Sequence, residues 1–242
     1  AEGQFVYLSV EYSLAPEYAF PVATKEILTV MSYLCETISS KSPIHVTGAS
    51  AGGNLAIVAA MECHRRYPGR VKSAVIGCPM LNPACDTLSY FQNPSTSVCP
   101  PSGWLRWCWR AYLDLPEQEF TRKAKNHEGL TDMDTILSQV SNRTVWEASK
   151  WRNTSLERLI NPAVDLPESL SEENAPRIIV TTNTADPLRE DGVALVAALK
   201  GRKAKVSHHD HFGSHWFGTS SDSTSFQALA DDWMEDLQLE MS

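Results

Sequence analysis

The sequence predicts an α/β fold with a mostly parallel sheet and helices on both faces. Apolar runs of strand length alternate with segments of helical periodicity, which is the pattern of strands joined by crossover helices. The chain has 242 residues, 43% of them hydrophobic, and this suits one domain with a single core. Between two of the expected strands, about a hundred residues bring no convincing strand. We therefore expect a single domain, residues 1–242, with a helical or loop-rich cap insertion at residues 82–160.

Five short runs are the expected strands: residues 5–10, 43–47, 71–78, 177–182 and 204–209. Apolar residues at helical spacing predict helices over residues 22–38, 54–67, 188–200 and 226–239. The carboxyl ends of parallel strands meet at one edge of the sheet. Functional side chains are expected at that edge.

The charge balance argues against a nucleic-acid partner. The formal net charge is −8, from 29 acidic and 21 basic residues, whereas nucleic-acid binding depends on clustered Lys and Arg. The uncharged run Ile27–Cys35 is far shorter than the ~20 apolar residues that a membrane span needs. We therefore expect a soluble protein without stable membrane insertion, and we assign it to the cytoplasm.

The six cysteines show no C-x-x-C motif, so neither a zinc signature nor a dense disulfide scaffold is present in the sequence. Most of them are expected to be reduced. Cys85, Cys99 and Cys108 share a segment expected to be loop-rich, which leaves a disulfide there open. Asn142 and Asn153 begin tripeptides that match the glycosylation acceptor pattern.

Ser50 stands at the centre of the motif Gly48-Ala49-Ser50-Ala51-Gly52, between an expected strand and an expected helix. In that context G-x-S-x-G is typical of a nucleophile elbow, in which glycines let the backbone fold tightly and expose the serine oxygen. The helix N-terminus and the Ala51 N–H would then point to where an oxyanion forms. The alternative is an ordinary glycine-rich turn between strand and helix.

A serine nucleophile needs a histidine base and a carboxylate that fixes the histidine tautomer. Asp186 follows the fourth expected strand and His215 follows the fifth, in the chain order Ser, acid, His. Asp186 could instead only cap the helix that begins nearby. Glu190 and Asp191 are expected to be solvated carboxylates in the first turn of that helix.

His208, His209 and His211 crowd the last strand and raise the alternative of a metal site. Adjacent residues of a strand point to opposite faces, so His208 and His209 cannot face the same way. No second motif of carboxylate and histidine accompanies them. We expect neither a metal nor a cofactor.

Taken together, the motifs resemble those of the hormone-sensitive-lipase-like carboxylesterase branch of the α/β-hydrolases. The similarity extends over nearly the whole chain. Tyr12–Pro21 resembles the family segment Y-R-L-A-P-E-x-x-F-P, and Gly48–Asn54 resembles its elbow G-D-S-A-G-G-N. Asp186–Gly192 resembles the acid segment D-P-L-R-D-E-G, Gly213–Phe217 resembles the histidine segment G-x-x-H-G-F, and Leu105–Leu113 resembles a W-x-x-Y-L stretch of the cap. The resemblance implies a triad of Ser50, Asp186 and His215.

The same resemblance implies hydrolysis of small-molecule carboxylic esters through an acyl-enzyme, as in carboxylesterases and lipases. Trp104 and Trp107 in the insertion and Trp216 beside His215 are the residues we assign to substrate binding. Packing within the insertion is the alternative role of the insertion tryptophans.

Three departures from the family pattern bear on activity. The family's H-G-G-G motif, whose glycine N–H groups supply most of the oxyanion hole, does not occur in these 242 residues, and Ala49 and Ser13 replace the usual Asp and Arg. We therefore expect an N-terminally truncated α/β-hydrolase. The alternative function is that of a non-catalytic small-molecule binding protein or an inactive fragment. The sheet edge exposed at residues 5–10 leaves oligomerisation through that edge open.

Overall fold

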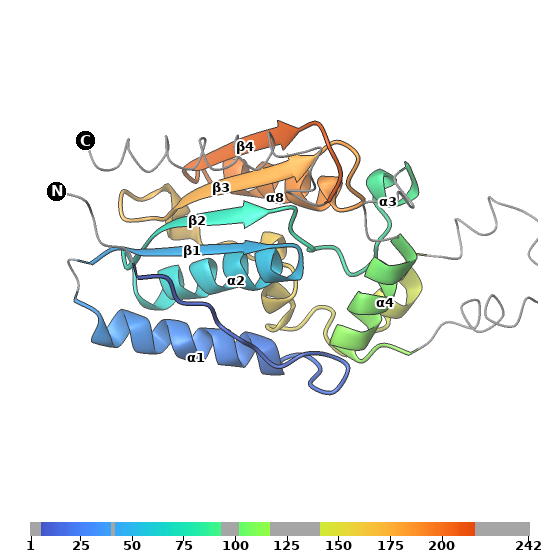
Figure 1. Ribbon diagram of the computed structural model, residues 1–242, viewed down its shortest axis with the longest axis horizontal. Coiled ribbons are helices and arrows are strands. Elements are labelled where there is room, and N and C mark those ends of the chain that lie inside the picture. Colours follow the sequence, from blue (N-terminus) through green and yellow to red (C-terminus); the bar gives the residue numbers. More distant parts are fainter. Residues whose placement is uncertain (1–5, 40–41, 93–101, 117–140, 216–242) are drawn as a thin grey trace, which may run out of the picture.

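The computed structural model describes residues 6–39, 42–92, 102–116 and 141–215. Within these residues the chain forms a parallel sheet with the strand order β1-β2-β3-β4 (Figure 1). The strands are β1 Ile44–Ala49, β2 Val71–Gly77, β3 Arg177–Asn183 and β4 Val206–His211. The expected parallel α/β architecture is confirmed.

The register of the sheet brings the strand ends to one edge. Gly77 of β2 pairs with Ala49 of β1 on one side and with Thr181 of β3 on the other. Thr181 in turn pairs with His209 of β4. The loops that leave these four strands at their carboxyl ends therefore start close together, which is where a parallel sheet places functional residues.

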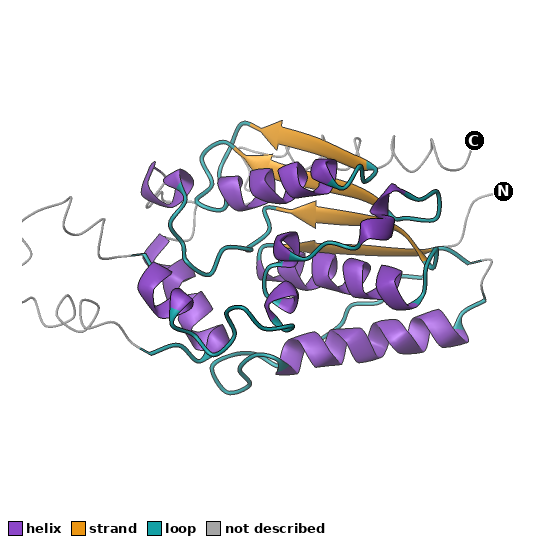
Figure 2. Ribbon diagram, turned by 180° about the vertical axis from the view of Figure 1, so that it is seen from behind, coloured by secondary structure: helices purple, strands orange, loops and turns teal. Residues whose placement is uncertain are grey.

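The described residues form three long helices, α1 Val22–Thr37, α2 Ala51–Arg66 and α8 Arg189–Gly201, of which α2 connects β1 to β2 and α8 connects β3 to β4. Helix α2 packs against β1 and β2, α8 packs against β3 and β4, and α1 packs against α2. Figure 2 shows α2 and α8 on the same face of the sheet. The expected helices at 22–38, 54–67 and 188–200 are confirmed within a few residues, and the one at 226–239 lies outside the described residues.

The core between these helices and the sheet is apolar and closely packed. Its fully buried members include Ile57 and Ala60 of α2, Ile76 of β2 and Ile178 of β3. They come from the apolar stripe of a helix and from alternate positions of central strands, so the periodicity of the sequence specifies this core. None of the helices in the described part of the chain is both long and apolar enough to cross a membrane.

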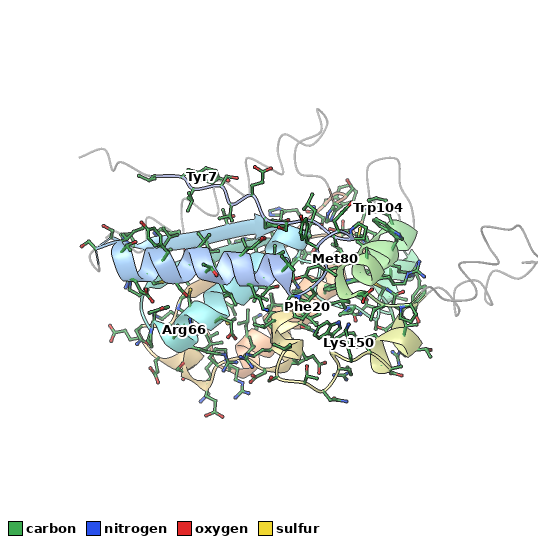
Figure 3. The ribbon with its side chains drawn as sticks, turned by 90° about the horizontal axis from the view of Figure 1, so that it is seen from below. Tyr7, Phe20, Arg66, Met80, Trp104 and Lys150 are labelled. Carbon is green, nitrogen blue, oxygen red and sulfur yellow. The ribbon has the colours of Figure 1, made fainter. Side chains whose placement is uncertain are left out.

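The expected strand at residues 5–10 is wrong where the structure describes it. Residues 6–10 have no regular secondary structure, and Val6 and Tyr7 are 96% and 82% exposed. Figure 3 shows Tyr7 across β1 from α1, apart from the sheet. A strand is held by the hydrogen bonds of a neighbouring strand, and within the described residues the segment has no such neighbour. Oligomerisation through the sheet edge stays a prediction.

The chain between β2 and β3 forms helices and turns, and its described residues contain no strand, as expected. The elements are α3 Leu88–Gln92, α4 Ser102–Leu113, α7 Arg143–Glu147 and the 3₁₀ turns Glu157–Leu159, Pro162–Val164 and Glu168–Ser171. Helices α3 and α4 lie beyond the carboxyl ends of the strands (Figure 1). The role of residues 82–160 as a cap stays a prediction.

A second apolar cluster holds this insertion to the body of the protein. Phe20 is 4% exposed, and its ring makes edge contacts with Tyr112 and Trp151, at centroid distances of 5.6 Å and 5.0 Å. Its N–H also donates to the carbonyl oxygen of Tyr112 at 2.6 Å. Phe20 precedes α1, so residues before that helix anchor the insertion (Figure 3).

The structure bears on the possible disulfide in the insertion and on the two glycosylation motifs. Cys85 and Cys108 are free thiols, and Cys99 lies outside the described residues. Asn142 is only 1% exposed, and its side-chain amide donates to the carbonyl oxygen of Arg106 at 3.0 Å. A buried, hydrogen-bonded amide is not accessible for glycosylation in the folded protein, whereas Asn153 is exposed.

Candidate active site

Ser50 occupies a tight turn between β1 and α2. Its backbone angles are φ 56° and ψ −122°, a conformation that non-glycine residues seldom adopt. The N–H of Ser50 donates to the carbonyl oxygen of Gly77 at 2.9 Å, and its own carbonyl accepts the N–H of Asn54 at 3.1 Å. The side chain is half-buried. This is the strained strand-to-helix geometry that a nucleophile elbow requires.

Close backbone contacts explain two of the glycines in this turn. A Cβ on Gly48 would lie 2.2 Å from the carbonyl oxygen of Gly52, a distance that no real side chain tolerates. A Cβ on Gly53 would lie 3.2 Å from the carbonyl oxygen of Gly77. A Cβ on Gly52 would meet nothing within 4 Å. The first glycine of the motif is therefore needed for the turn itself.

Asp186 and His215 form a buried pair. Asp186 follows β3 and is fully buried, and His215 follows β4 and is 8% exposed. Nδ1 of His215 lies 2.8 Å from Oδ2 of Asp186. A carboxylate that accepts the Nδ1 proton leaves Nε2 as the proton acceptor, which is the tautomer a general base needs.

Asp186 also serves the capping role that the sequence left open. Its Oδ1 accepts the N–H of Leu188 at 2.8 Å, just before α8 begins. The two carboxylate oxygens thus have different partners, one in the helix entry and one on the histidine. The first contact orients the carboxylate for the second.

Asp191 is buried, contrary to the expectation from the sequence. It was expected to be solvated, but it is 2% exposed, and its Oδ2 accepts the N–H groups of Leu81 and Asn82, both at 2.9 Å. Burial raises the pKa of its carboxyl group to about 8. One signal in the sequence could have revealed this, because Asp191 lies at helical spacing with the buried Leu188 and Leu195.

Asp191 thereby links α8 to the segment beside Ser50. Met80, directly before Leu81, donates its N–H to the carbonyl oxygen of Ser50 at 3.1 Å. The segment at residues 80–82 is thus held by Ser50 on one side and by Asp191 on the other. Asn54 of α2 adds a further tie, since its side-chain amide donates to the carbonyl oxygens of Met80 and Ile160, at 3.0 Å and 2.6 Å.

Glu190 is neither fully solvated, as expected, nor buried like Asp191. It is half-buried, and its Oε2 accepts the N–H of Ser89 at 3.0 Å. It therefore joins the first turn of α8 to α3 and is not simply solvated.

The histidines of β4 point to opposite faces, as strand alternation requires. His208 contacts the hydroxyl of Thr182 at 2.9 Å, whereas the rings of His209 and His211 lie parallel to each other, 6.3 Å apart. They do not converge on a common point. Among the described residues, the group of three whose side chains could share a metal ion is Cys78, Asp186 and His215.

The structure describes two of the three tryptophans assigned to substrate binding. Trp104 and Trp107 lie on α4, are 55% and 40% exposed, and stack at a centroid distance of 4.8 Å. Helix α4 lies beyond the carboxyl ends of the strands (Figure 1), and Trp104 is labelled on it in Figure 3. Trp216 lies outside the described residues. Ala51 is exposed at the first position of α2, where helical N–H groups lack partners within the helix.

Known proteins are similar to this chain in sequence and in fold. A family model described as α/β-hydrolase fold matches residues 1–125. Arylacetamide deacetylase of Oryctolagus cuniculus is 25% identical over 238 residues, which cover 87% of this chain and 59% of the relative. Neutral cholesterol ester hydrolase 1 of Bos taurus is 25% identical over 247 residues, covering 88% of this chain and 59% of the relative.

Solved structures agree on the fold. A structure from a study of two fungal esterases from Rhizomucor miehei has a TM-score of 0.66 at 21% identity, covering 95% of this chain and 62% of that one. The chain spans 59% of the length of the two curated relatives. The family model covers more than half of this chain, and the matched part includes the Ser50 turn. This chain therefore belongs to the α/β-hydrolase fold family, in its hormone-sensitive-lipase-like branch.

Proposed function

We propose that this protein hydrolyses carboxylic esters with Ser50 as nucleophile, His215 as general base and Asp186 as the residue that orients His215. The observation that carries the proposal is the buried 2.8 Å contact between Asp186 and His215 at the edge of the sheet where the strained Ser50 turn also lies. The names of the relatives, a deacetylase and a cholesterol ester hydrolase, support the same class of reaction.

The proposed reaction has two steps. In the first, Nε2 of His215 accepts the proton of the Ser50 hydroxyl as Oγ attacks the ester carbonyl. The proton then goes to the departing alcohol, and the acyl group remains on Ser50. The Ala51 N–H stabilises the negative oxygen of the tetrahedral intermediate. In the second step, His215 activates water, which releases the acid and restores Ser50. Asp186 holds His215 in the required tautomer throughout.

The exposed pair Trp104 and Trp107 supports a substrate with an apolar acyl or alcohol group. Their stacked indoles offer a flat apolar surface on α4, the helix that lies beyond the carboxyl edge of the sheet (Figure 1). Trp216, beside His215 in the sequence, is the third residue that we assign to this role.

Covalent labelling tests the nucleophile. A fluorophosphonate probe should label the folded protein on Ser50, as located by peptide mapping. Ser50→Ala should abolish the label and lower hydrolysis of a p-nitrophenyl ester by about 10³-fold or more. Ser32→Ala, on α1, should keep both. Labelling of another residue, or none, would contradict the proposal.

The alternative to hydrolysis is binding of a small molecule without turnover. Ester hydrolysis no faster in the wild type than in Ser50→Ala, together with saturable binding of a non-hydrolysable ester analogue, would establish this second function.

A further inference from the structure

A thiol lies beside the Asp186–His215 pair. Cys78 directly follows β2, is 1% exposed and has no role in the proposed hydrolysis. The thiol sulfur of Cys78, a carboxylate oxygen of Asp186 and a ring nitrogen of His215 all lie within 4.8 Å of one another. Three elements of the sheet therefore bring three different metal-ligating atoms to one point.

We propose that Cys78, Asp186 and His215 form an inhibitory binding site for Zn²⁺. Sulfur, nitrogen and oxygen together are the donor set of zinc and cobalt, whereas Mg²⁺ and Ca²⁺ prefer oxygen alone. Three protein ligands leave the fourth tetrahedral position to water.

The geometry requires only a small adjustment. Zinc bonds of about 2.3 Å to sulfur and about 2.0–2.2 Å to nitrogen or oxygen place tetrahedral ligand atoms about 3.5 Å apart. The widest pair of the group must therefore approach by at most about 1.3 Å, and the 2.8 Å contact between His215 and Asp186 must open by about 0.7 Å if Nδ1 binds the ion. Side-chain rotations of Cys78 and His215 can supply both changes. With a thiolate and a carboxylate as ligands, the two charges of the ion are neutralised inside the protein.

The backbone at Cys78 restricts where its side chain can go. Its φ of 38° is uncommon for a residue other than glycine. The N–H of Cys78 donates to the carbonyl oxygen of Thr181 at 2.9 Å, which fixes the end of β2 against β3. An unusual backbone held by a neighbouring strand is a constraint that keeps the thiol near the pair.

The inhibitory effect rests on the proposed function, whereas binding of the ion does not. If the metal takes Nδ1 of His215, the proton that Nδ1 shared with Asp186 moves to Nε2, which can then no longer accept the serine proton. If it takes Nε2, it occupies the lone pair that accepts the serine proton. In both cases the thiol proton of Cys78 is released to solvent, and hydrolysis stops.

Binding is tested with Co²⁺ as a spectroscopic substitute for Zn²⁺. The protein, freed of metal by chelation, should develop the sulfur-to-cobalt charge-transfer absorption and the visible bands of tetrahedral Co²⁺, and equimolar Zn²⁺ should remove them. Cys78→Ala should lose the charge-transfer band and bind Zn²⁺ at least about 100-fold more weakly. Cys108→Ala, which changes a thiol outside the group, should behave as wild type. Cys78→Ser provides the same readout if the alanine variant does not fold.

Inhibition is tested on the hydrolysis of a p-nitrophenyl ester, with each variant compared with its own metal-free rate. Zn²⁺ should inhibit the wild type and Cys108→Ala, EDTA should restore the rate, and Cys78→Ala should resist inhibition. A wild type without the charge-transfer band, or a Cys78→Ala variant that keeps it, overturns the proposal. A cobalt band that depends on Cys78 in a protein without esterase activity would support the site and refute the proposed function instead.

Discussion

At the scale of single residues, the structure explains why the Ser50 motif has its particular glycines. The backbone of the turn brings the carbonyl oxygen of Gly52 next to the Cα of Gly48, which leaves no room for a side chain there. Position 52 itself faces open space. The two glycines of G-x-S-x-G therefore differ in their importance for folding, although they are equivalent in the motif.

This difference predicts opposite effects of the same substitution. Gly48→Ala should lower the free energy of unfolding by about 2–3 kcal/mol or more, because the new Cβ forces the turn apart. Gly52→Ala, within the first turn of α2, should leave it unchanged or raise it by up to about 1 kcal/mol, because alanine favours helices. Urea denaturation of both variants measures the difference. Equal effects would show that crowding at Gly48 does not govern the turn.

At the scale of elements, α8 does more than cover the sheet. Asp186, just before this helix, contacts His215. Asp191, in its first turn, accepts hydrogen bonds from the N–H groups of Leu81 and Asn82. Tyr90 of α3 lies 3.4 Å from the same carboxylate oxygen. One helix end therefore holds Asp186 and the entry to the insertion together.

Asp191 predicts a pH dependence of stability. Its pKa is about 8 in the folded protein because burial disfavours the charged form, against about 3.9 in the unfolded chain. Between these pH values the folded state binds more protons than the unfolded state. The contribution of the Asp191 carboxyl group to the free energy of unfolding is therefore complete at low pH and is lost as pH rises from about 4 to about 8. The wild type should lose stability on the order of a few kcal/mol over that range, and Asp191→Asn should not show this loss.

Urea denaturation at several pH values between about 5 and 8 provides the measurement. Glu190→Gln is the matched control, since Glu190 is adjacent to Asp191 but only half-buried. A wild type whose stability rises with pH, or an Asp191→Asn variant with the wild-type slope, would contradict this prediction.

At the scale of the whole molecule, one apolar cluster fills the space between the sheet and its helices, and a second joins the insertion to the body of the protein. Phe20 belongs to the second cluster, where it is buried between residues of α4 and the turn after α7. A hydroxyl contact of 2.8 Å between Thr24 of α1 and Tyr112 of α4 adds to the same junction. The position of the Trp104–Trp107 surface on α4 therefore depends on residues before and within α1.

Removing the Phe20 ring should loosen this junction. Phe20→Ala should lower the free energy of unfolding by about 3–5 kcal/mol, as is typical of a buried aromatic residue. Tyr18→Ala, an aromatic change two residues earlier at a position that is 55% exposed, should stay within about 0.5 kcal/mol of wild type. Urea unfolding compares them, and similar losses in both variants would show that Phe20 does not anchor the insertion.

Most of the regular fold could be predicted from the sequence, because helical and strand periodicities are local. Four expected strands and three expected helices are present in the described residues. The errors concern residues whose state depends on distant neighbours. Residues 6–10 are apolar enough for a strand but lack a ladder partner within the described chain, and Asp191 and Asn142 are polar but buried by segments far away in sequence.

The sequence by itself determined the Ser50 turn and the order of the proposed triad, since glycine sterics and the alternation of strands and helices are encoded within a few residues. Only the tertiary structure decided that His215 meets Asp186, 29 residues away, and that Cys78 lies beside them. It also decided that Asp191 is buried. These facts follow from the register of the sheet and from the packing of the insertion, which no local pattern specifies.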